Sequence, residues 1–468
     1  MDQELQWGGR FASAPDPRLL AFGSSLEDDL VLAPFDVLCS RAHVLALRGG
    51  AIVDLATARA LDAALARVAA EIETGTFASW ARAGDFEDVH GAIDARVRTF
   101  CPGVEGERLH AGRSRNDQVA TTLLLYARDR ARLGATALQR LVRDVLARAS
   151  EALADGSILA ATTHWQPAQP ISLAFWLAAF AESLVRAQRR FTRVAADARA
   201  SCPLGSGACS GSTLPLDRDA AAKALDFDAP SRNALDAIGN RDVLLDLDHA
   251  VLRAVGAAAR ASEEFVLWCT PAFGYARLGD AASTGSSLMP QKRNPDPFEL
   301  VRAHAHAGTG SFVAAFGSQT SLALSYHRDL QETKGAAIRG IERGFAALDA
   351  FARAFTYLAF DGAAMTARAR DGYTVATDVA DALILGGLPA RSAHEFVGRA
   401  VTAAEAQRRP LDERDLEEIG RAAGVAHFRA PLDPHASLLA KRTTGSTHPR
   451  EIERSIEELG RLVAEQVP

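Results

Sequence analysis

Cysteine is scarce in this 468-residue sequence, and the cysteines that occur are scattered along the chain. Their number is odd, and no two of them form a CxxC pair. The five residues are Cys39, Cys101, Cys202, Cys209 and Cys269. This usage excludes a disulfide framework and a cysteine-based zinc site, and it predicts reduced thiols in a cytosolic protein.

Segments that would direct the chain to a membrane are also missing from the sequence. The N-terminal stretch MDQELQWGGRF lacks the basic start and the apolar core of a signal peptide. The longest apolar run, around Ile171 to Ala181, is too short to span a bilayer and ends at Glu182. A net charge of -6 gives no reason to expect a nucleic-acid or membrane partner. With 48% hydrophobic residues, the sequence predicts a folded cytoplasmic protein.

Strand alternation, internal repeats and low-complexity tracts are absent, whereas helical periodicity is strong. Apolar residues recur at helical spacing over four long segments, at about 116–150, 171–200, 241–269 and 335–358. A helix of about 30 residues is roughly 45 Å long, which is more than the width of a small domain. The apolar faces of these segments are broad. We therefore expect a long helical bundle that other copies of the chain partly cover.

The length of the segments divides the chain into three sections. Residues 1–111 form a mixed N-terminal section, in which prolines and glycines break the pattern often. Residues 112–360 form the long-helix section, and residues 361–468 form a small helical C-terminal section. In the last section, Ser392 followed three residues later by Glu395 predicts a capping-box helix start.

Polar, irregular stretches interrupt the long helices. Four of them are AGRSRNDQ at 111–118, TTHWQPAQP at 162–170, GSSLMPQKRNP at 285–295 and YHRDLQETK at 326–334. A fifth, PLGSGACSGS at 203–212, is rich in glycine and serine. Together they offer cationic and amide donors, hydroxyls and an imidazole, which suits the binding of an anionic substrate. The ends of a long bundle could bring these stretches together into one site.

Each stretch also has a simpler interpretation. The glycine-serine stretch has no lysine after it and no strand before it, which disfavours a phosphate-binding loop. Ser114 or Asn116 could cap a helix, with Asp117 facing its positive end. His164 could be an ordinary structural hydrogen-bonding residue. Glu299 could belong to a capping box that Asp296 begins. The residues alone predict a mostly helical, anion-handling enzyme.

The same stretches resemble the argininosuccinate lyase family of the fumarase/aspartase superfamily. GSSLMPQKRNP resembles the signature loop of the superfamily, and GRSRNDQ, THWQPAQP, PLGSGA, RDLQETK and WGGRF (7–11) resemble the family versions. The resemblance runs from about residue 7 to about residue 450. It implies a mostly α, three-section fold with a twenty-helix core in a homotetramer. It also implies active sites shared between three subunits, without a metal or an organic cofactor.

The resemblance implies a reversible elimination in which argininosuccinate gives arginine and fumarate. Ser286 is then the base, and we expect backbone donors or helix dipoles to activate its weakly basic hydroxyl. Lys292 and Asn294 would stabilise the extra negative charge of the carbanion-like intermediate. His164, paired with Glu299, would handle the other proton or orient the substrate. The loop that carries Ser286 would act as a lid.

The resemblance assigns substrate contacts as well. They are Ser25, Asn116, Thr163, Tyr326, Gln331 and Lys334, to which the fork of Arg115 is added because it suits a carboxylate. We further expect that changes at Gln331 and Lys334 affect binding more than folding, because their segment is polar.

Two alternatives stay open on the sequence. One is a related carbon–nitrogen lyase that releases fumarate from another N-substituted aspartate. The other is a non-catalytic structural protein of the same family.

Overall fold

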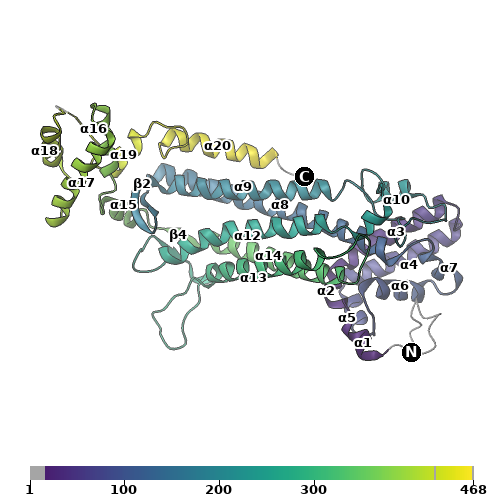
Figure 1. Ribbon diagram of the computed structural model, residues 1–468. Helices are drawn as coiled ribbons and strands as arrows, with labels where there is room; N and C mark the ends of the chain where they lie inside the picture. Colours follow the sequence, from purple (N-terminus) through teal and green to yellow (C-terminus); the bar gives the residue numbers. More distant parts are fainter. Residues whose placement is uncertain (1–15, 426–427, 466–468) are drawn as a thin grey trace.

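The computed structural model describes residues 16–425 and 428–465 of the chain. The WGGRF stretch at residues 7–11 lies outside the described residues. Within them, nearly all regular structure is helical, as the sequence predicts. The helices are arranged as an elongated body with a smaller group of helices at each end (Figure 1).

Long helices run side by side through the middle of the molecule (Figure 1). They are α8 (Arg115–Asp155), α9 (Leu173–Asp197), α12 (Asp242–Trp268), α13 (Asp296–Gln319) and α14 (Leu330–Thr356). Four of them confirm the four periodic segments. The fifth, α13, was not predicted, because most of its large apolar residues do not gather on one buried face. Only Phe298, Val301 and Ala315 of α13 are buried within the chain.

Helix α8 has clear start and stop signals. The side chain of Ser114 caps its first turn. The Ser114 backbone N–H donates a hydrogen bond to the Asp117 carboxylate, which completes a capping box. The helix ends at Gly156, whose φ of 73° is the left-handed conformation that glycine tolerates best. The capping interpretation of this stretch is therefore confirmed, with Ser114 as the cap.

Aromatic rings and glycines hold the bundle together. Phe265 of α12 lies 5.2 Å from Phe298 of α13 and 6.2 Å from Phe351 of α14, measured between ring centroids. Gly344 lets α14 approach α12 closely, because a Cβ atom there would lie 2.1 Å from Val251. Packing of this density gives a rigid support for any site at the ends of the bundle.

The N-terminal group consists of short helices and covers one end of the bundle (Figure 1). They are α1 (Pro17–Phe22), α2 (Leu26–Asp29), η2 (Leu30–Leu32), α3 (Ala33–Gly49), α4 (Leu55–Glu73), α5 (Thr76–Arg82), α6 (Val89–Phe100), α7 (Val104–Glu107) and η3 (Arg108–His110). Two more short helices, α10 (Arg218–Ala224) and α11 (Ala234–Gly239), connect α9 to α12. The segment 17–49 is long and apolar enough to cross a membrane by composition, but 61% of its most apolar 18-residue window is buried inside the molecule. This burial is typical of a core segment.

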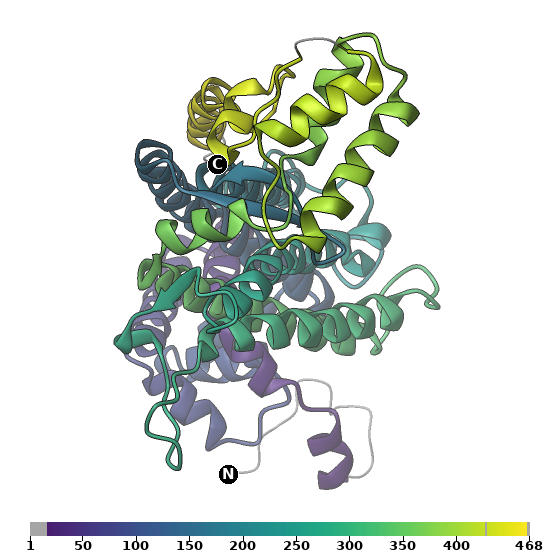
Figure 2. The same ribbon diagram turned by 90° about the vertical axis from the view of Figure 1, so that its left-hand side faces the viewer.

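The C-terminal group lies at the opposite end, and its last helix returns along the bundle (Figures 1 and 2). Its helices are α15 (Gly362–Arg370), α16 (Ala376–Leu385), α17 (Ala390–Ala406), α18 (Glu413–Ala423), α19 (Pro434–Ala440) and α20 (Pro449–Glu465). The predicted capping box at Ser392 is wrong, because α17 already begins at Ala390 after Pro389. Glu395 instead lies 3.5 Å from Arg391, one turn earlier.

Two small antiparallel sheets complete the fold. Strand β1 (Ile158–Thr163) pairs with β2 (Gln166–Ser172), and β3 (Ala276–Leu278) pairs with β4 (Leu358–Phe360). The prediction of an irregular segment at 162–170 is therefore wrong. Two prolines and two glutamines concealed a β-hairpin, whose strands are too polar and too short to show alternation.

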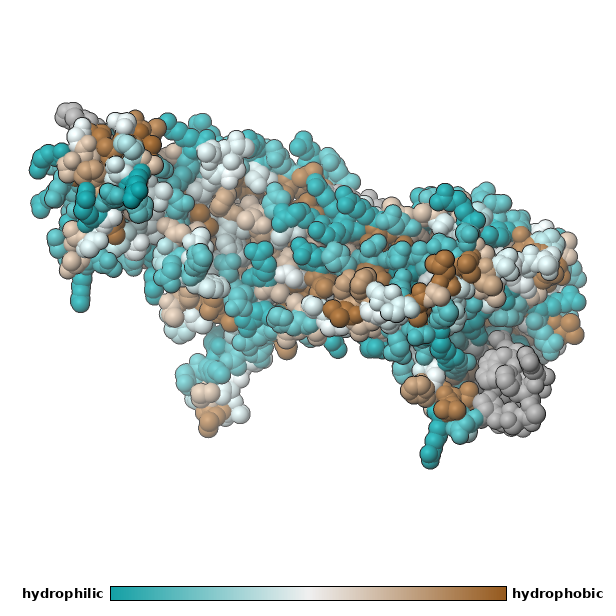
Figure 3. All heavy atoms as spheres, in the orientation of Figure 1, coloured by the Kyte–Doolittle hydropathy of each residue, from teal (hydrophilic) through white to brown (hydrophobic). Residues whose placement is uncertain are grey.

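Large apolar side chains stay exposed on α13 within one chain. Leu300 is 58% exposed, Val313 63% and Phe316 52%. The space-filling view shows apolar areas scattered among the hydrophilic surface of the bundle (Figure 3).

Candidate active site

The site residues predicted from the sequence lie at opposite ends of the bundle. Asn116 is in the first turn of α8, whereas Thr163 and His164 follow the last residue of the same helix by less than ten positions. Helix α8 has 41 residues, which corresponds to a length of about 60 Å. One chain therefore holds two separate groups of predicted residues.

The first group, here called the α2 cluster, lies where α2 meets the start of α14 and α8 (Figure 1). It contains Ser25, Arg115, Asn116, Tyr326, Gln331 and Lys334. The second group is here called the hairpin end. It contains Thr163 at the end of β1, His164 on the β1–β2 turn, and Ser286, Lys292, Asn294 and Glu299 on the signature loop and the start of α13.

Lys334 and Ser25 share a buried carboxylate at the centre of the α2 cluster. Lys334 Nζ lies 2.6 Å from Asp29 Oδ1, and Ser25 Oγ donates to Asp29 Oδ2 at 2.6 Å. Lys334 Nζ also donates to Ser25 Oγ at 3.3 Å. Because Asp29 is fully buried, it holds the ammonium and the hydroxyl in fixed positions. The sequence reasoning missed Asp29, although its acidic stretch SLEDDL was a usable signal.

Gln331 lies one turn before Lys334 on α14 and also contacts the N-terminal part of the α2 cluster. Its Nε2 donates to the carbonyl of Gly23 at 3.1 Å. Arg328 donates to that carbonyl as well and forms an ion pair with Glu87 Oε1 at 2.6 Å. These contacts tie the loop after α1 to the start of α14.

Arg115 and Asn116 are held by partners that the sequence did not indicate. Arg115 Nε lies 3.3 Å from Asp88 Oδ2, and one of its terminal nitrogens donates to Gln118 Oε1 at 2.8 Å. Asn116 Nδ2 donates to the carbonyl of Ala208 at 2.9 Å. The guanidinium and the amide are thus oriented before any substrate binds.

A buried network supports Arg115 from below. Gln118 Nε2 donates to Asp36 Oδ1 at 2.7 Å, and His90 Nδ1 lies 3.0 Å from the same oxygen. Burial alone would raise the pKa of Asp36, but His90, Arg113 and Gln118 outweigh it and lower the pKa to about 2. Asp36 therefore stays ionised at neutral pH.

The glycine-serine stretch at 203–212 donates backbone hydrogen bonds to a buried carboxylate of the same chain. The backbone N–H groups of Gly205 and Gly207 donate to Asp117 Oδ2 at 3.0 and 2.9 Å. Burial is the main reason why the pKa of Asp117 rises to about 6, against the lowering effect of these donors. The N–H groups of Gly205 and Gly207 are thus occupied by the Asp117 carboxylate.

Tyr326 completes the α2 cluster beside a buried arginine. Burial raises the pKa of the Tyr326 phenol, which Arg328 and Arg241 lower in part. Arg241 is 3% exposed, and burial lowers its pKa to about 10. Its Nε has no hydrogen-bond partner among the described residues. Arg241 was not among the residues singled out from the sequence, although the polar stretch GNRD at 239–242 was a usable signal.

At the hairpin end, His164 and Trp165 form the two-residue turn between β1 and β2. Their φ values are 55° and 60°, a region that residues with a side chain rarely occupy and that costs about 1 kcal/mol or more for each residue. His164 is exposed and makes no hydrogen bond within the described residues. The simple structural interpretation of His164 is therefore not supported. Strain of this kind is typical of functional sites.

Ser286 receives two backbone hydrogen bonds in the signature loop. The N–H groups of Leu288 and Met289 donate to its Oγ at 3.2 and 3.1 Å. Donors of this kind stabilise a negative charge on the oxygen and so favour its deprotonated form. Backbone donors of this kind were expected at a serine base, and the role of Ser286 stays a prediction.

The loop stands away from the bundle on a narrow base (Figures 1 and 2). Asn294 N donates to Thr284 O at 2.9 Å, which closes the base, while the Asn294 amide donates to Thr284 Oγ1 at 3.3 Å. Lys292 is exposed, and its ammonium has no partner in the described chain. Leu288 near the tip is 85% exposed. Such a segment can move as a unit about its base.

Glu299 lies on the first turn of α13 and does not belong to a capping box. Pro295 occupies the cap position and makes no side-chain cap bond, while Asp296 is already the first helical residue. The Asp296 carboxylate accepts a hydrogen bond from Thr284 instead. Within the described chain, Glu299 and His164 make no contact with each other, so their predicted pairing requires a second chain.

Over residues 16–425 and 428–465, no three His, Cys, Asp or Glu side chains gather in a way that could hold a metal ion. A family model described as Lyase matches residues 9–308, and one described as Argininosuccinate lyase C-terminal matches residues 373–438.

Two relatives with the name argininosuccinate lyase are similar over nearly the whole chain. The protein from Synechococcus sp. (strain JA-3-3Ab) is 39% identical and is matched over 94% of this chain and 89% of its own length. The protein from Clavibacter michiganensis subsp. michiganensis is 38% identical, over 98% of this chain and 92% of its own.

Solved structures share the fold at lower identity. The crystal structure of EDDS lyase in complex with formate has a TM-score of 0.81 at 24% identity, over 97% of this chain and 91% of its own. Class II fumarase from Schistosoma mansoni has a TM-score of 0.72 at 14% identity, over 87% of this chain and 91% of its own. These likenesses show a fumarase/aspartase-like fold.

Proposed function

The chain belongs to the argininosuccinate lyase family and is a carbon–nitrogen lyase that cleaves argininosuccinate to arginine and fumarate; on this premise we propose how its residues share the work. The α2 cluster of one chain binds the substrate, and the hairpin end of other chains supplies the acid and base. The separation of the two groups by the length of α8 is the observation that carries this proposal, because one chain cannot complete a site.

The α2 cluster suits an extended, charged substrate. Lys334, Arg115 and the amides of Asn116 and Gln331 offer oriented donors for carboxylates. Asp29 and Asp88 keep two of these cations in place, so binding requires little reorganisation. Thr163 would add a hydroxyl from the hairpin of another chain.

The hairpin end suits proton transfer and charge stabilisation. Ser286 would take the proton beside the substrate carboxylate, with its Oγ polarised by two backbone donors. Lys292 and Asn294 would stabilise the dianionic intermediate, where charge develops during the reaction. His164, oriented by Glu299 of another chain, would transfer the other proton or orient the leaving guanidinium. Closure of the loop over the substrate would exclude water.

This sharing implies a homotetramer in which each site draws on three chains, as the family resemblance suggests. The exposed apolar residues of α13 support an assembly, because large apolar faces of this kind are normally covered. We also propose a three-section division at 1–111, 112–360 and 361–468, and a place in the cytoplasm, where an arginine-forming lyase would act.

Fumarate release tests the substrate. The protein should release fumarate from argininosuccinate much faster than from aspartates that carry other N-substituents. If another N-substituted aspartate is the better substrate, the chain acts as a related lyase, and if none reacts, the residue roles proposed above are wrong.

Mixing two variants that are impaired in different halves of the site tests the sharing of sites. Ser286→Ala changes only the hairpin end, and Gln331→Ala changes only the α2 cluster. When the two variants are unfolded, mixed and reassembled, some sites should combine two unchanged halves and regain part of the activity. A mixture that is no more active at low substrate concentration than its two components would contradict shared sites.

A further inference from the structure

A pocket of about 400 Å³ lies where the β1–β2 hairpin, the start of α9, the end of α12 and the end of α15 meet. This volume suits a small molecule. Three of the five tryptophans of the chain line the pocket, together with a phenylalanine and a tyrosine. These aromatic residues are Trp165, Trp176, Trp268, Phe273 and Tyr275. None of the residues assigned above to the hairpin end lines the pocket, so it is separate from the candidate active site.

The aromatic rings are set at steep angles to one another. Trp176 and Trp268 lie 4.9 Å apart between ring centroids at an interplanar angle of 55°, and Trp268 and Tyr275 lie 6.1 Å apart at 63°. Phe273 and Tyr275 are 5.5 Å apart at 85°. Rings at such angles can turn several faces toward one space, and the face of a ring attracts a cation. The arrangement is therefore that of an aromatic cage.

Trp165 lines the pocket from the turn of the hairpin, and packing does not explain its position. Its side chain is 56% exposed, so it contributes little to the core. Its φ of 60° is a conformation that residues with a side chain rarely adopt. A strained turn that holds an exposed indole beside a pocket is typical of a ligand contact.

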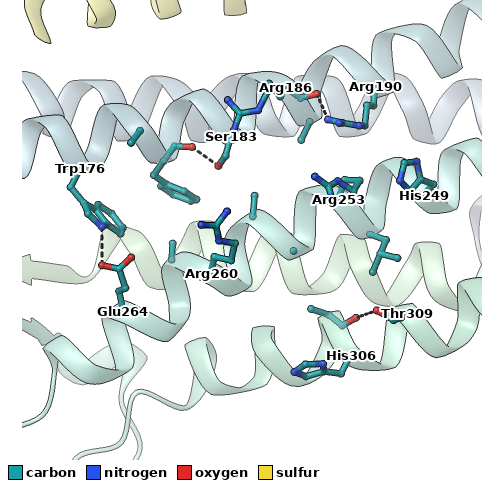
Figure 4. A pocket seen from close by; sticks show the side chains of 18 residues that line it. Trp176, Ser183, Arg186, Arg190, His249, Arg253, Arg260, Glu264, His306 and Thr309 are labelled. Atoms are coloured by element: carbon teal, nitrogen blue, oxygen red, sulfur yellow. Dashed lines mark hydrogen bonds between the residues drawn. The ribbon is translucent and has the colours of Figure 1, made fainter. Parts of the chain in front are cut away.

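Two carboxylates give the pocket a negative charge. Glu264 accepts a hydrogen bond from the indole N–H of Trp176 at 2.9 Å (Figure 4). Asp371 is exposed and makes no side-chain hydrogen bond or ion pair within the described residues. Arg368 lines the pocket as well, but its guanidinium donates to the carbonyl of Ala272 at 2.7 Å. The lining side chains thus carry two negative charges and one positive charge at neutral pH.

Glu264 would gain from a cationic ligand. Burial raises the pKa of its carboxyl, and the hydrogen bond from Trp176 and the charge of Arg260 offset this only in part. A cation in the pocket would stabilise the ionised carboxylate. An anion would instead lie beside two carboxylates, and a neutral ligand would leave both of them without a counter-charge.

We propose that this pocket binds a small organic cation, whose guanidinium or quaternary ammonium head lies among the aromatic rings and pairs with Glu264 and Asp371. Aromatic cages suit such heads, because their charge is spread out and weakly hydrated. The site does not depend on the reaction proposed above, because its lining residues belong to neither the α2 cluster nor the hairpin end.

Matched pairs of ligands test the need for charge. Isothermal titration calorimetry of the full chain compares choline with its neutral analogue, in which a quaternary carbon replaces the nitrogen, and ethylguanidinium with ethylurea. Each cation should bind about tenfold tighter or more than its neutral analogue, because only the cation gains from the ring faces and the carboxylates. The tighter of the two cations identifies the head group that the pocket prefers.

Substitutions in the lining test the location. Trp165→Leu removes one ring of the cage at an exposed position and should weaken cation binding by about tenfold. Glu264→Gln removes the charge but keeps an oxygen that can accept the hydrogen bond of Trp176, so it should weaken cation binding to a similar extent without unfolding the protein. Circular dichroism checks that each variant is folded.

Control variants separate this pocket from other sites. Asp371→Asn should weaken cation binding by a few-fold, since its carboxylate is exposed. Asp381→Asn, the same change at an exposed carboxylate that does not line the pocket, should have no effect. Gln331→Ala, which changes the α2 cluster, should also leave the affinity for the cations unchanged.

Several results would overturn the proposal. It fails if neither cation binds, or if the cations and their neutral analogues bind equally well. Cation binding that Trp165→Leu and Glu264→Gln both leave unchanged would place the cation elsewhere on the molecule. Cation binding that Gln331→Ala abolishes would assign it to the α2 cluster. If the cations bind as expected but the wild type releases no fumarate from argininosuccinate, the proposed function fails and the cation site stands.

Discussion

At the scale of single residues, the positions of hydrogen-bond donors decide what each side chain can do. Ser286 lies on an exposed loop, yet two backbone N–H groups point at its oxygen. Lys334 lies at a helix start, yet it is 5% exposed and paired with a fully buried carboxylate. The two residues should therefore respond to substitution in different ways.

Replacement of Ser286 by alanine should lower turnover by about two to four orders of magnitude, as for other positioned acid–base groups. Substrate should still bind, because the α2 cluster is unchanged. The melting temperature should stay close to that of the wild type, since the loop contributes little to the core. Steady-state fumarate release and thermal denaturation measure the two effects.

The neighbouring Ser287→Ala provides the control, because Ser287 accepts and donates no hydrogen bond within the described chain. It should change turnover by a few-fold at most. Near-wild-type turnover of Ser286→Ala would remove Ser286 from the base role and transfer it to His164.

Replacement of Lys334 by alanine should lower both activity and stability. From the sequence we expect little effect of this change on folding, and the structure contradicts that expectation, because Asp29 would be left buried without its cation. Loss of one partner of such a pair costs about 3–5 kcal/mol. Urea denaturation should show the loss.

The double variant Lys334→Ala/Asp29→Asn separates the two roles of Lys334. It should recover much of the stability but none of the activity, whereas Gln331→Ala should weaken substrate binding with little change in stability. A double variant that is as unstable as Lys334→Ala would contradict the ion-pair explanation.

At the scale of helices and strands, periodicity predicts an element only where one chain buries its apolar face. The helices α8, α9, α12 and α14 have such faces, and the sequence predicted all four. The apolar face of α13 is not covered within the chain, and few side chains hold the β1–β2 hairpin in place. The sequence pattern therefore revealed neither element. Site residues followed from motifs, whereas their partners Asp29, Asp88 and Arg241 come from distant segments and could not be found by spacing.

Three of these helices meet around the buried carboxyl of Asp248 on α12. Its Oδ2 has no hydrogen-bond partner, and a Cβ atom on Gly340 of α14 would lie 2.9 Å from its Oδ1 and 3.0 Å from Ser311 of α13. Burial raises the pKa of Asp248 to about 7. The folded state therefore binds a proton that the unfolded state releases near pH 4.

Stability should accordingly fall as the pH rises from about 4 to 7 and stay at the lower value above that range. Asp248→Asn removes the charge, so it should be more stable than the wild type at pH 8 by a few kcal/mol and nearly equal to it at pH 4. Denaturation at both pH values measures the difference. The exposed Asp381→Asn should show no gain at pH 8, and the absence of a gain for Asp248→Asn would contradict the assignment.

At the scale of the whole molecule, the end of the chain closes onto the central bundle. The carbonyl of Val463 on α20 accepts hydrogen bonds from Gln139 of α8 at 3.3 Å and from Gln188 of α9 at 3.2 Å. Leu459 on the same face of α20 is 1% exposed. The C-terminal helix is thus a structural part of the bundle, although it follows the small C-terminal group in sequence.

Leu459→Ala should therefore destabilise the protein by about 2–5 kcal/mol, the usual cost of removing a large buried side chain. Glu457→Ala, which changes an exposed residue two positions earlier, should have little effect. Thermal denaturation of both variants tests whether the packing of α20 against the bundle stabilises the protein. Equal melting temperatures would show that α20 can leave the bundle without cost.

Because α8 is one unbroken helix, it limits which insertions and deletions the sequence can accept in evolution. Each residue inserted into a helix turns everything beyond it by about 100° and moves it by about 1.5 Å. An insertion or deletion inside α8 would therefore misalign the two half-sites in every chain at once, and no single later substitution could repair it. We expect descendants of this sequence to tolerate length changes in surface loops while they inherit α8 at constant length.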